Sequence, residues 1–420
     1  MQPALTRRQL LQGLSLLGPA LVAAKRAQAM QPSTQLTPLD QAVLPRDVRS
    51  RFVNNVNGIR MHVLEAGFDR SNRSAVLLVH GFPELAYSWR KVMPAIAAAG
   101  YHVIAPDLRG YGRSGGTDVK YDDDLSPWRT LNEVTDMVGL VSAFGYRSVA
   151  VVGHDFGSPV AAWCAVVRPD MFQSVVLMSA PFGGPPALPF NSADAPASGA
   201  TTPPADTIYD ELAKLTPPRK HYQRYYSTRE ANDNMRNARQ GVHAFLRAYY
   251  HMKSADWKRN QPFPLEARTA DEWAKLPRYY VMDLDKGMAE TVAPEMPSAS
   301  EIAACKWLPD DELRVYSTEY ARTGFQGGLQ SYRVGSSGRF NADLQLFSGR
   351  TIDQPSMFVA GKSDWGAYQN PGVLERMQKT ACTRMTGIHF VDSAGHWVQQ
   401  EQPERVGALF IDFLKQTARS

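Results

Sequence analysis

The sequence predicts an α/β protein built on one mostly parallel central sheet, with helices on both faces and one large, mainly helical insertion. Three observations lead to this prediction. Short apolar runs alternate with helix-like segments from about residue 50 onwards, a pattern typical of parallel sheets. The alternation breaks at Pro181, where a stretch rich in Pro, Gly, Ala and Ser begins, and it resumes near residue 355. With 420 residues, 44% of them hydrophobic and 21% charged, the chain is long enough to bury a sizeable core.

The alternating segments are assigned in order along the chain. Short apolar runs indicate strands, and apolar residues spaced three and four apart indicate helices. Before the insertion, the expected strands are residues 60–67, 74–82, 101–110, 148–155 and 172–181, and the expected helices are 87–100, 131–145 and 158–167. After it, the expected strands are 355–364 and 387–396, and the expected helices are 371–381 and 403–416. The predicted domains are an export signal (1–29), a core in two parts (30–181 and 341–420) and the insertion, called the cap (182–340).

The first 29 residues resemble an export signal. Arg7 and Arg8 precede an apolar stretch of 15 residues, and the small-x-small sequence AQA ends at Ala29. This arrangement resembles a twin-arginine signal, so we expect the export machinery as a partner and a periplasmic or secreted mature protein. The alternative is a basic N-terminal tail on a cytoplasmic protein. The apolar stretch is too short to span a bilayer comfortably.

The net charge and the cysteine pattern limit which partners and cofactors are expected. Four of the five excess positive charges lie in residues 1–29, so the rest of the chain gives no reason to expect a nucleic-acid partner. The three cysteines form neither a C-x-x-C pair nor a metal-binding pattern, and we expect no metal and no cofactor. A disulfide between Cys305 and Cys382 is permitted outside the cytoplasm but is not required.

The sequence VGHDFGSP, residues 152–159, has the pattern of a nucleophile elbow: a strand, a tight turn flanked by glycines, and a helix. Asp155 occupies the tip of this turn, where many hydrolases have a serine. Asp364 and His396 lie at the ends of two later predicted strands, and the carboxyl ends of parallel strands meet at one edge of a sheet. Taken alone, Asp364 could cap a helix and His396 could lie in a loop. Because the three stand in the chain order nucleophile, acid, histidine, we expect a catalytic triad.

From residue 50 to the C-terminus, the chain resembles the α/β-hydrolase fold, and specifically its epoxide hydrolase branch. The resemblance is carried by HGFPELAYSWR (80–90), DLRGYGRS (107–114), GHDFG (153–157) and AGHWVQQEQPERV (394–406). It implies that Asp155 is the nucleophile, His396 the general base and Asp364 the acid that orients the histidine. It also implies an oxyanion hole formed by the backbone N–H groups of Phe82 and Phe156.

The same resemblance implies two catalytic tyrosines in the cap. The stretch HYQRYY points to Tyr222, and GGLQSYR points to Tyr332. The cap contains many other tyrosines, so the alternative is that both merely pack its core. The expected substrate-binding residues are His80, Pro83, Phe156 and Trp397.

A carboxylate nucleophile suits a reaction at an sp³ carbon. Attack by Asp155 on an epoxide carbon opens the ring and forms an alkyl ester on the enzyme. Water activated by His396 hydrolyses that ester at its carbonyl carbon and releases a vicinal diol, whereas a serine would form a stable ether. Two phenols, with a reference pKa of about 10, would donate to the alkoxide. The expected partner is therefore a small epoxide, and an aromatic-rich cap favours an apolar one.

Two other functions stay open on the sequence alone. A dehalogenase of the same fold, acting on haloalkanes or haloacids, also uses an aspartate. However, Phe82 and Phe156 stand where such enzymes typically have side-chain N–H donors for the halide. An α/β-hydrolase-fold binding protein without catalysis usually lacks a triad member, and all three are present here. Nothing in the sequence indicates an oligomeric state.

Overall fold

A computed structural model describes residues 36–69, 72–188 and 207–417. The predicted export signal, residues 1–29, lies outside the described residues and stays a prediction. Within the described ranges, no helix is both long and apolar enough to cross a membrane. The elements below belong to the unit Pro38–Ser420, as far as it is described.

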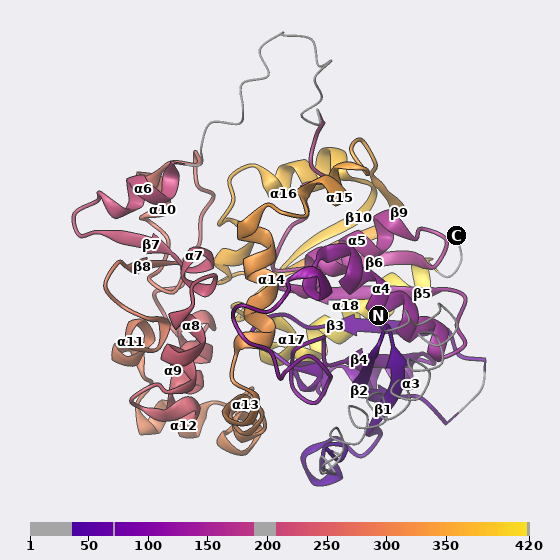
Figure 1. Cartoon of the computed structure of the whole chain (residues 1–420). Coiled ribbons are helices and arrows are strands. Elements are labelled where there is room, and N and C mark those ends of the chain that lie inside the picture. Colours follow the sequence, from indigo (N-terminus) through magenta and orange to yellow (C-terminus); the bar gives the residue numbers. More distant parts are fainter. Residues whose placement is uncertain (1–35, 70–71, 189–206, 418–420) are drawn as a thin grey trace, which may run out of the picture. The chain divides into compact units, whose positions relative to one another are not determined.

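The centre of the fold is an eight-stranded sheet with the order β1-β2-β4-β3-β5-β6-β9-β10 (Figure 1). Strand β2 runs antiparallel to β1 and β4, and all the other neighbours pair in parallel. The bounds are Val48–Val56 (β1), Ile59–Ala66 (β2), Ala75–Val79 (β3), His102–Pro106 (β4), Val149–His154 (β5), Phe172–Met178 (β6), Ile352–Gly361 (β9) and Cys382–Val391 (β10). Strands β3 and β4 are buried along their whole length, which explains their continuous apolar runs. The prediction of a mostly parallel sheet is confirmed.

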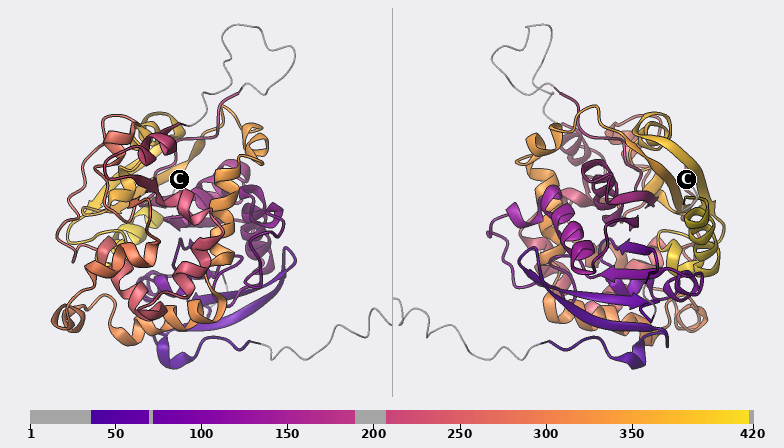
Figure 2. Two further views of the ribbon diagram at one scale, coloured as in Figure 1. Left: turned by 60° about the vertical axis from the view of Figure 1, so that its left-hand side comes forward. Right: turned by 90° about the vertical axis from the view of Figure 1, so that its right-hand side faces the viewer.

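Helices cover both faces of this sheet. Strand β3 lies between β4 and β5, so the chain first moves to one side of β3 and then crosses to the other. Because crossovers between parallel strands are right-handed, the helices that follow β3 and β4 fall on opposite faces. The first, α3 (Met93–Ala98), packs against α18 (Pro403–Thr417); the second, α4 (Thr130–Ala143), packs against α5 (Gly157–Val167). Figure 2 shows the sheet and the helices around it from two further sides.

The segment between β6 and β9 contains the cap. It is mainly helical, as predicted, but it also holds an antiparallel pair, β7 (Arg219–His221) with β8 (Val281–Asp283). Strands this short leave no periodic signal in a sequence. The helices are α6 (Ile208–Ala213), α7 (Tyr222–Tyr226), α8 (Glu230–Arg236), α9 (Gly241–Lys253), α10 (Ala270–Trp273), α11 (Met288–Val292), η4 (Ala293–Glu295), α12 (Ala299–Ala304), α13 (Asp310–Thr323), α14 (Gln326–Ser337) and α15 (Asn341–Gln345). In Figure 1, α14 runs between the core and the cap helices α6 to α12.

Several predicted elements differ from the structure. The expected helix 87–100 is split into a 3-10 turn, η2 (Ala86–Trp89), and α3, because Pro94 lies in the first turn of α3 and has no N–H to continue a longer helix. The expected helix 371–381 is one α-helical turn, α16 (Val373–Arg376), followed by a π-helix, η6 (Met377–Ala381). The remaining short helices are η1 (Gln41–Val43), η3 (Ser126–Trp128), η5 (Trp365–Ala367) and α17 (Val398–Glu401). All three cysteines are free, so the permitted disulfide does not form.

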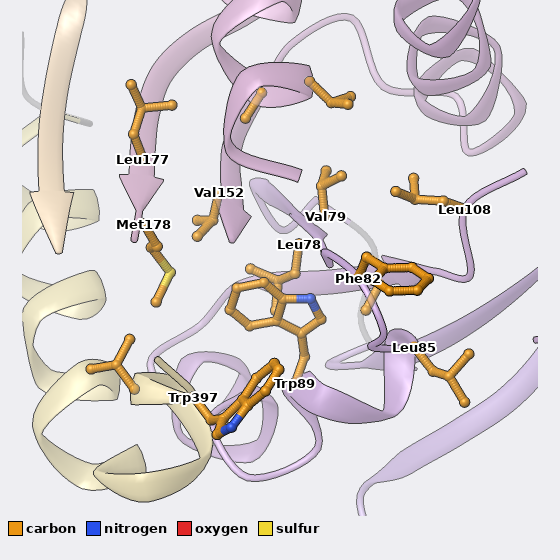
Figure 3. Close-up of a cluster of buried hydrophobic side chains, with 14 of the residues drawn as sticks. Leu78, Val79, Phe82, Leu85, Trp89, Leu108, Val152, Leu177, Met178 and Trp397 are labelled. Atoms are coloured by element: carbon orange, nitrogen blue, oxygen red, sulfur yellow. The ribbon is translucent and has the colours of Figure 1, made fainter. Parts of the chain in front are cut away.

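The apolar core continues beyond the strand ends. Figure 3 shows Trp89 and Trp397 just past the ends of the strands that carry Val152 and Met178. Both tryptophans are fully buried. Deleting a buried aromatic side chain typically lowers the free energy of unfolding by about 3–5 kcal/mol. The two rings therefore stabilise the edge of the sheet where the predicted triad residues lie.

Helix α14 approaches the core through two glycines. Gly327 and Gly328 face Gly110 and Tyr111 of the DLRGYGRS stretch, and a methyl group on Gly327 would overlap the carbonyl of Gly110. Backbone therefore packs directly on backbone at this point. The contact lies little more than one turn before Tyr332 on the same helix, so it sets how closely that tyrosine approaches the core.

We expect Gly327→Ala to destabilise the folded protein by about 1–3 kcal/mol, because the added methyl overpacks a backbone contact. Gly335→Ala, on the same helix, is the control. No atom lies within 4 Å of its added methyl, and alanine favours a helix over glycine by about 0.5–1 kcal/mol. Denaturant unfolding of both variants measures the difference, and equal stabilities would contradict the expected effect.

Candidate active site

Asp155 lies at the tip of the turn between β5 and α5. Its φ of +51° is a left-handed conformation, which is costly for a residue other than glycine and persists only when its surroundings hold it. The Asp155 N–H donates to the Met178 carbonyl (3.2 Å), and the Asp155 carbonyl accepts from the Ser158 N–H (3.0 Å). A side chain at Gly157 would overlap the Val79 carbonyl, so the turn needs that glycine to pack on β3. The result is the geometry of a nucleophile elbow, with the carboxylate at its tip.

The three predicted triad residues meet at the edge of the sheet. His396 Nδ1 lies 3.0 Å from Asp364 Oδ1, and His396 Nε2 lies 3.2 Å from Asp155 Oδ2. Asp364 Oδ1 also accepts from the Gly366 N–H (2.8 Å), which fixes the carboxylate. With Nδ1 held by Asp364, Nε2 is the ring nitrogen of His396 that faces Asp155. This is the arrangement that a general base requires.

Asp155 is held in its ionised form. Burial by itself opposes ionisation, but the imidazole of His396 beside it and the positive charge of Lys253 keep the pKa of Asp155 well below its usual value. For Asp364, burial is likewise outweighed by the charge and hydrogen bond of His396, which lower its pKa. Both acids are therefore available as carboxylates at neutral pH, one to attack and one to orient the histidine.

The Phe82 N–H lies where an oxyanion hole needs a donor. It donates to Asp155 Oδ1 over 2.9 Å, so it already contacts an oxygen that would become negative when water attacks an Asp155 ester. Phe156 follows Asp155 directly and is the N-cap of α5. No bond to the Phe156 N–H is found among the described residues, and its role as second donor stays a prediction.

Tyr222 and Tyr332 come together from different cap helices. Their ring centroids are 6.2 Å apart, and the Tyr332 ring also lies 5.4 Å from each of the rings of Phe82 and Phe156. Burial, reinforced by the negative charge of Asp155, raises the pKa of both tyrosines well above the usual value. Both hydroxyls therefore keep their protons and can serve as donors close to Asp155.

The two hydroxyls have different partners. Tyr222 donates to Gln369 Oε1 (3.4 Å) and accepts from Gln223 Nε2 (3.2 Å). Within the described ranges, no hydrogen bond to the Tyr332 hydroxyl is found, and aromatic rings surround its side chain instead. Sequence reasoning missed both glutamines: Gln223 is part of the HYQRYY stretch, but Gln369 lies in a loop with no motif.

Three of the expected substrate-binding residues have hydrogen-bond partners within the protein. Both ring nitrogens of the fully buried His80 bind backbone, Nδ1 to the Gly81 carbonyl (2.8 Å) and Nε2 to the Leu108 N–H (3.0 Å). The Pro83 carbonyl accepts from the Tyr250 hydroxyl (3.0 Å). Trp397 donates to the Tyr250 carbonyl (2.9 Å) and packs edge-on against His396. These contacts give the three residues supporting positions; the fourth, Phe156, lines an open cavity.

Two buried ionisable residues near the triad were not identified from the sequence. Glu84 Oε2 lies 2.5 Å from His154 Nδ1, and His154 Nε2 lies 2.7 Å from the His396 carbonyl. Burial opposes the ionisation of both, but their mutual attraction raises the pKa of His154 and lowers that of Glu84. Both belong to quoted motifs, yet the pairing depends on the end of β5 meeting the loop after β3 in space. Lys253, at the end of α9, was also missed, because a single lysine on a helix gives no signal.

A cavity of about 270 Å³ opens beside Phe156, the neighbour of Asp155 in the chain. Phe156, Tyr332 and Gln223 line it, so it reaches the groups that surround Asp155. Its other walls are both apolar and polar, and include Trp128, Leu131, Glu133, Arg129, Arg224, Val334, Phe340 and Leu344. Within the described ranges, including this cavity, no group of three or more His, Cys, Asp or Glu side chains could hold a metal ion.

Glu133 in this cavity wall is a buried acid joined to the cap. Its Oε1 accepts from the Ser331 hydroxyl (2.9 Å), next to Tyr332. Burial raises the pKa of Glu133 to about 8. At pH values between the ordinary glutamate pKa and about 8, Glu133 keeps its proton in the folded protein and loses it in the unfolded chain. The stabilisation that the protonated Glu133 gives the folded state is therefore lost as pH rises across that interval.

We expect Glu133→Gln to remove this pH-dependent loss, because glutamine stays neutral and still accepts from Ser331. Relative to the wild type, the variant should gain stability between pH 5 and pH 8.5, as measured by denaturant unfolding at both pH values. Ser331→Ala keeps the carboxyl group and should keep the wild-type trend. Parallel pH profiles for the wild type and Glu133→Gln would show that Glu133 is ionised throughout.

Known proteins match the chain over most of its length. Residues 74–403 match the alpha/beta hydrolase fold family. "Epoxide hydrolase B" of Mycobacterium tuberculosis is 30% identical over 371 residues, which cover 86% of this chain and 96% of that protein. "Epoxide hydrolase" of Caballeronia sordidicola is 30% identical over 359 residues, with 86% and 92% covered.

Solved structures of epoxide hydrolases also resemble this chain over most of its length. "Epoxide hydrolase from an endophytic Streptomyces" has a TM-score of 0.70 and 30% identity, and covers 90% of this chain and 98% of that one. Epoxide hydrolase A from Mycobacterium thermoresistibile has a TM-score of 0.65 and 30% identity, with 88% and 98% covered. The chain thus belongs to the α/β-hydrolase fold family, with epoxide hydrolases as relatives over most of its length.

Proposed function

We propose that this protein hydrolyses an epoxide to a vicinal diol through an alkyl ester of Asp155. The epoxide hydrolase relatives make it a hydrolase acting on ether bonds. The observation that carries the proposed route is the elbow itself. It presents a carboxylate, rather than a hydroxyl, within 3.2 Å of His396 and close to two protonated tyrosines.

In the first step, an Asp155 carboxylate oxygen attacks one epoxide carbon and the carbon–oxygen bond of the ring breaks. The electron pair of that bond moves to the epoxide oxygen, which takes a proton from Tyr332 or Tyr222. Because burial keeps both phenols protonated, they can stabilise this oxygen as its charge develops. The product is a hydroxyalkyl ester of Asp155.

In the second step, water attacks the ester carbonyl carbon of Asp155. His396 Nε2 takes a proton from the water, and Asp364 stabilises the imidazolium that forms. The Phe82 N–H donates to the oxygen that becomes negative, and the loss of one such donor typically costs about 3–4 kcal/mol. Collapse of the intermediate expels the diol alkoxide, which takes the proton of the newly formed Asp155 carboxylic acid and leaves the carboxylate. The proton held by His396 returns to the tyrosine that gave one up in the first step.

The two alternative functions have less support. A halide leaving group needs donors, but Phe82 and Phe156 present only apolar side chains beside Asp155. Both rings pack against Tyr332 instead. A binding protein without catalysis would not need Asp364, His396 and Asp155 in mutual contact.

We expect His396→Gln to stall the enzyme as its ester, because the base for the second step is gone. Intact-mass spectrometry after incubation with small apolar epoxides should show a gain equal to the whole epoxide, located on Asp155 by peptide mapping. Asp155→Asn is the control and should gain no mass. A gain only from haloalkanes, equal to the haloalkane minus HX, would instead make the protein a dehalogenase.

We expect Tyr332→Phe and Tyr222→Phe each to slow ester formation by at least about tenfold, because each removes a proton donor for the epoxide oxygen. The larger loss should follow Tyr332→Phe, since the Tyr222 hydroxyl also donates to Gln369. Rapid-quench measurement of ester formation tests this. Tyr225→Phe makes the same change on the same helix and should have no effect; an equal loss in all three variants would contradict a donor role.

A further inference from the structure

Glu401 is joined to the loop that carries His396. It is the last residue of α17, and its side chain accepts three backbone N–H groups. Oε2 accepts from Gly395 (2.9 Å) and from Ala255 (2.8 Å), and Oε1 accepts from Trp397 (3.0 Å). Gly395 and Trp397 are the two neighbours of His396 in the chain. One carboxyl group therefore holds both sides of the catalytic histidine.

The same carboxyl group connects this loop to the cap. Ala255 follows α9, and the carbonyl of Lys253 at the end of that helix accepts the His396 N–H (2.9 Å). A side chain at Gly395 would overlap the backbone around Ser254, so the two segments lie in direct contact. The backbone of His396 is thus fixed through its neighbours by Glu401 and through its own N–H by the cap.

We propose that Glu401 is a positioning residue that keeps His396 Nε2 in line for hydrolysis of the Asp155 ester. This inference rests on the proposed function. His396 acts as a base only in the second step, and misplacing a catalytic group by about 1 Å costs as much as about 100-fold in rate. Loss of the Glu401 contacts should therefore slow ester hydrolysis and leave ester formation, which uses Asp155 and the tyrosines, nearly unchanged.

The test is a single-turnover comparison of Glu401→Gln with the wild type. Glutamine keeps the volume of glutamate but puts an NH₂ group where one oxygen accepts backbone N–H groups. Rapid quench and intact-mass spectrometry measure the two steps separately. We expect ester hydrolysis to slow by at least about tenfold, ester formation to stay within about twofold, and the ester to accumulate. Gln402→Ala is the control, because it removes a different bond to the same loop, from Gln402 Nε2 to the Ser393 carbonyl (3.0 Å), and should change neither rate.

Equal slowing of both steps, or no change in either, would overturn the proposal. If Glu401→Gln does not fold, as judged by circular dichroism, Glu401→Asp serves instead, since it keeps the carboxyl group but shortens the reach. If the wild type forms no ester with any epoxide, the proposed function fails, and a crystal structure of the variant then tests the positioning role alone. If the distance between His396 Nε2 and Asp155 Oδ2 stays at 3.2 Å in the variant, the positioning role of Glu401 is overturned.

Discussion

The Asp155 carboxylate carries its charge where water has little access, since only 14% of its side chain is exposed. Burying an unpaired charge costs several kcal/mol, and the fold offsets this cost from three directions. His396 lies on one oxygen, the Phe82 N–H binds the other, and the Lys253 charge acts from the cap. Each of these groups depends on a different part of the chain, so the charge of one residue links the strand ends, the loops and the cap.

In the proposed mechanism, the chemistry is divided between the core and the cap. The core would supply the nucleophile, the base and the oxyanion donor, all from the carboxyl ends of parallel strands and the loops that follow them. The cap would supply the two phenols that protonate the epoxide oxygen. Such a division requires a fixed arrangement of the two parts, and the contacts that fix it include the glycine contact of α14 with the loop at Gly110 and the Glu401 contact with Ala255.

Much of the fold and of the site could be predicted because it is local in the sequence. The elbow at Asp155 is a strand, a turn and a helix in one short stretch, and Asp364 and His396 each follow a run of apolar residues. Short elements escaped prediction because they have no period to detect, as β7 and β8 show. Charged and polar partners such as Glu84, Lys253 and Gln369 escaped because their roles arise from segments that meet only in the folded chain. His80 shows the reverse: a motif residue near the site whose ring is fully used by backbone bonds.

Helix α14 serves two purposes along its length. Its first turns are fixed by the glycine contact and by the bond between Ser331 and Glu133, and they place the Tyr332 hydroxyl. Ser331, Tyr332 and Val334 also line the cavity, together with Phe340 and Leu344 further along the chain. One turn of the helix therefore both anchors the tyrosine and forms part of the cavity wall. If the cavity takes the substrate, a library of variants that reshapes it belongs at Phe340 and Leu344, beyond the helix, where a substitution leaves the proton donor in place.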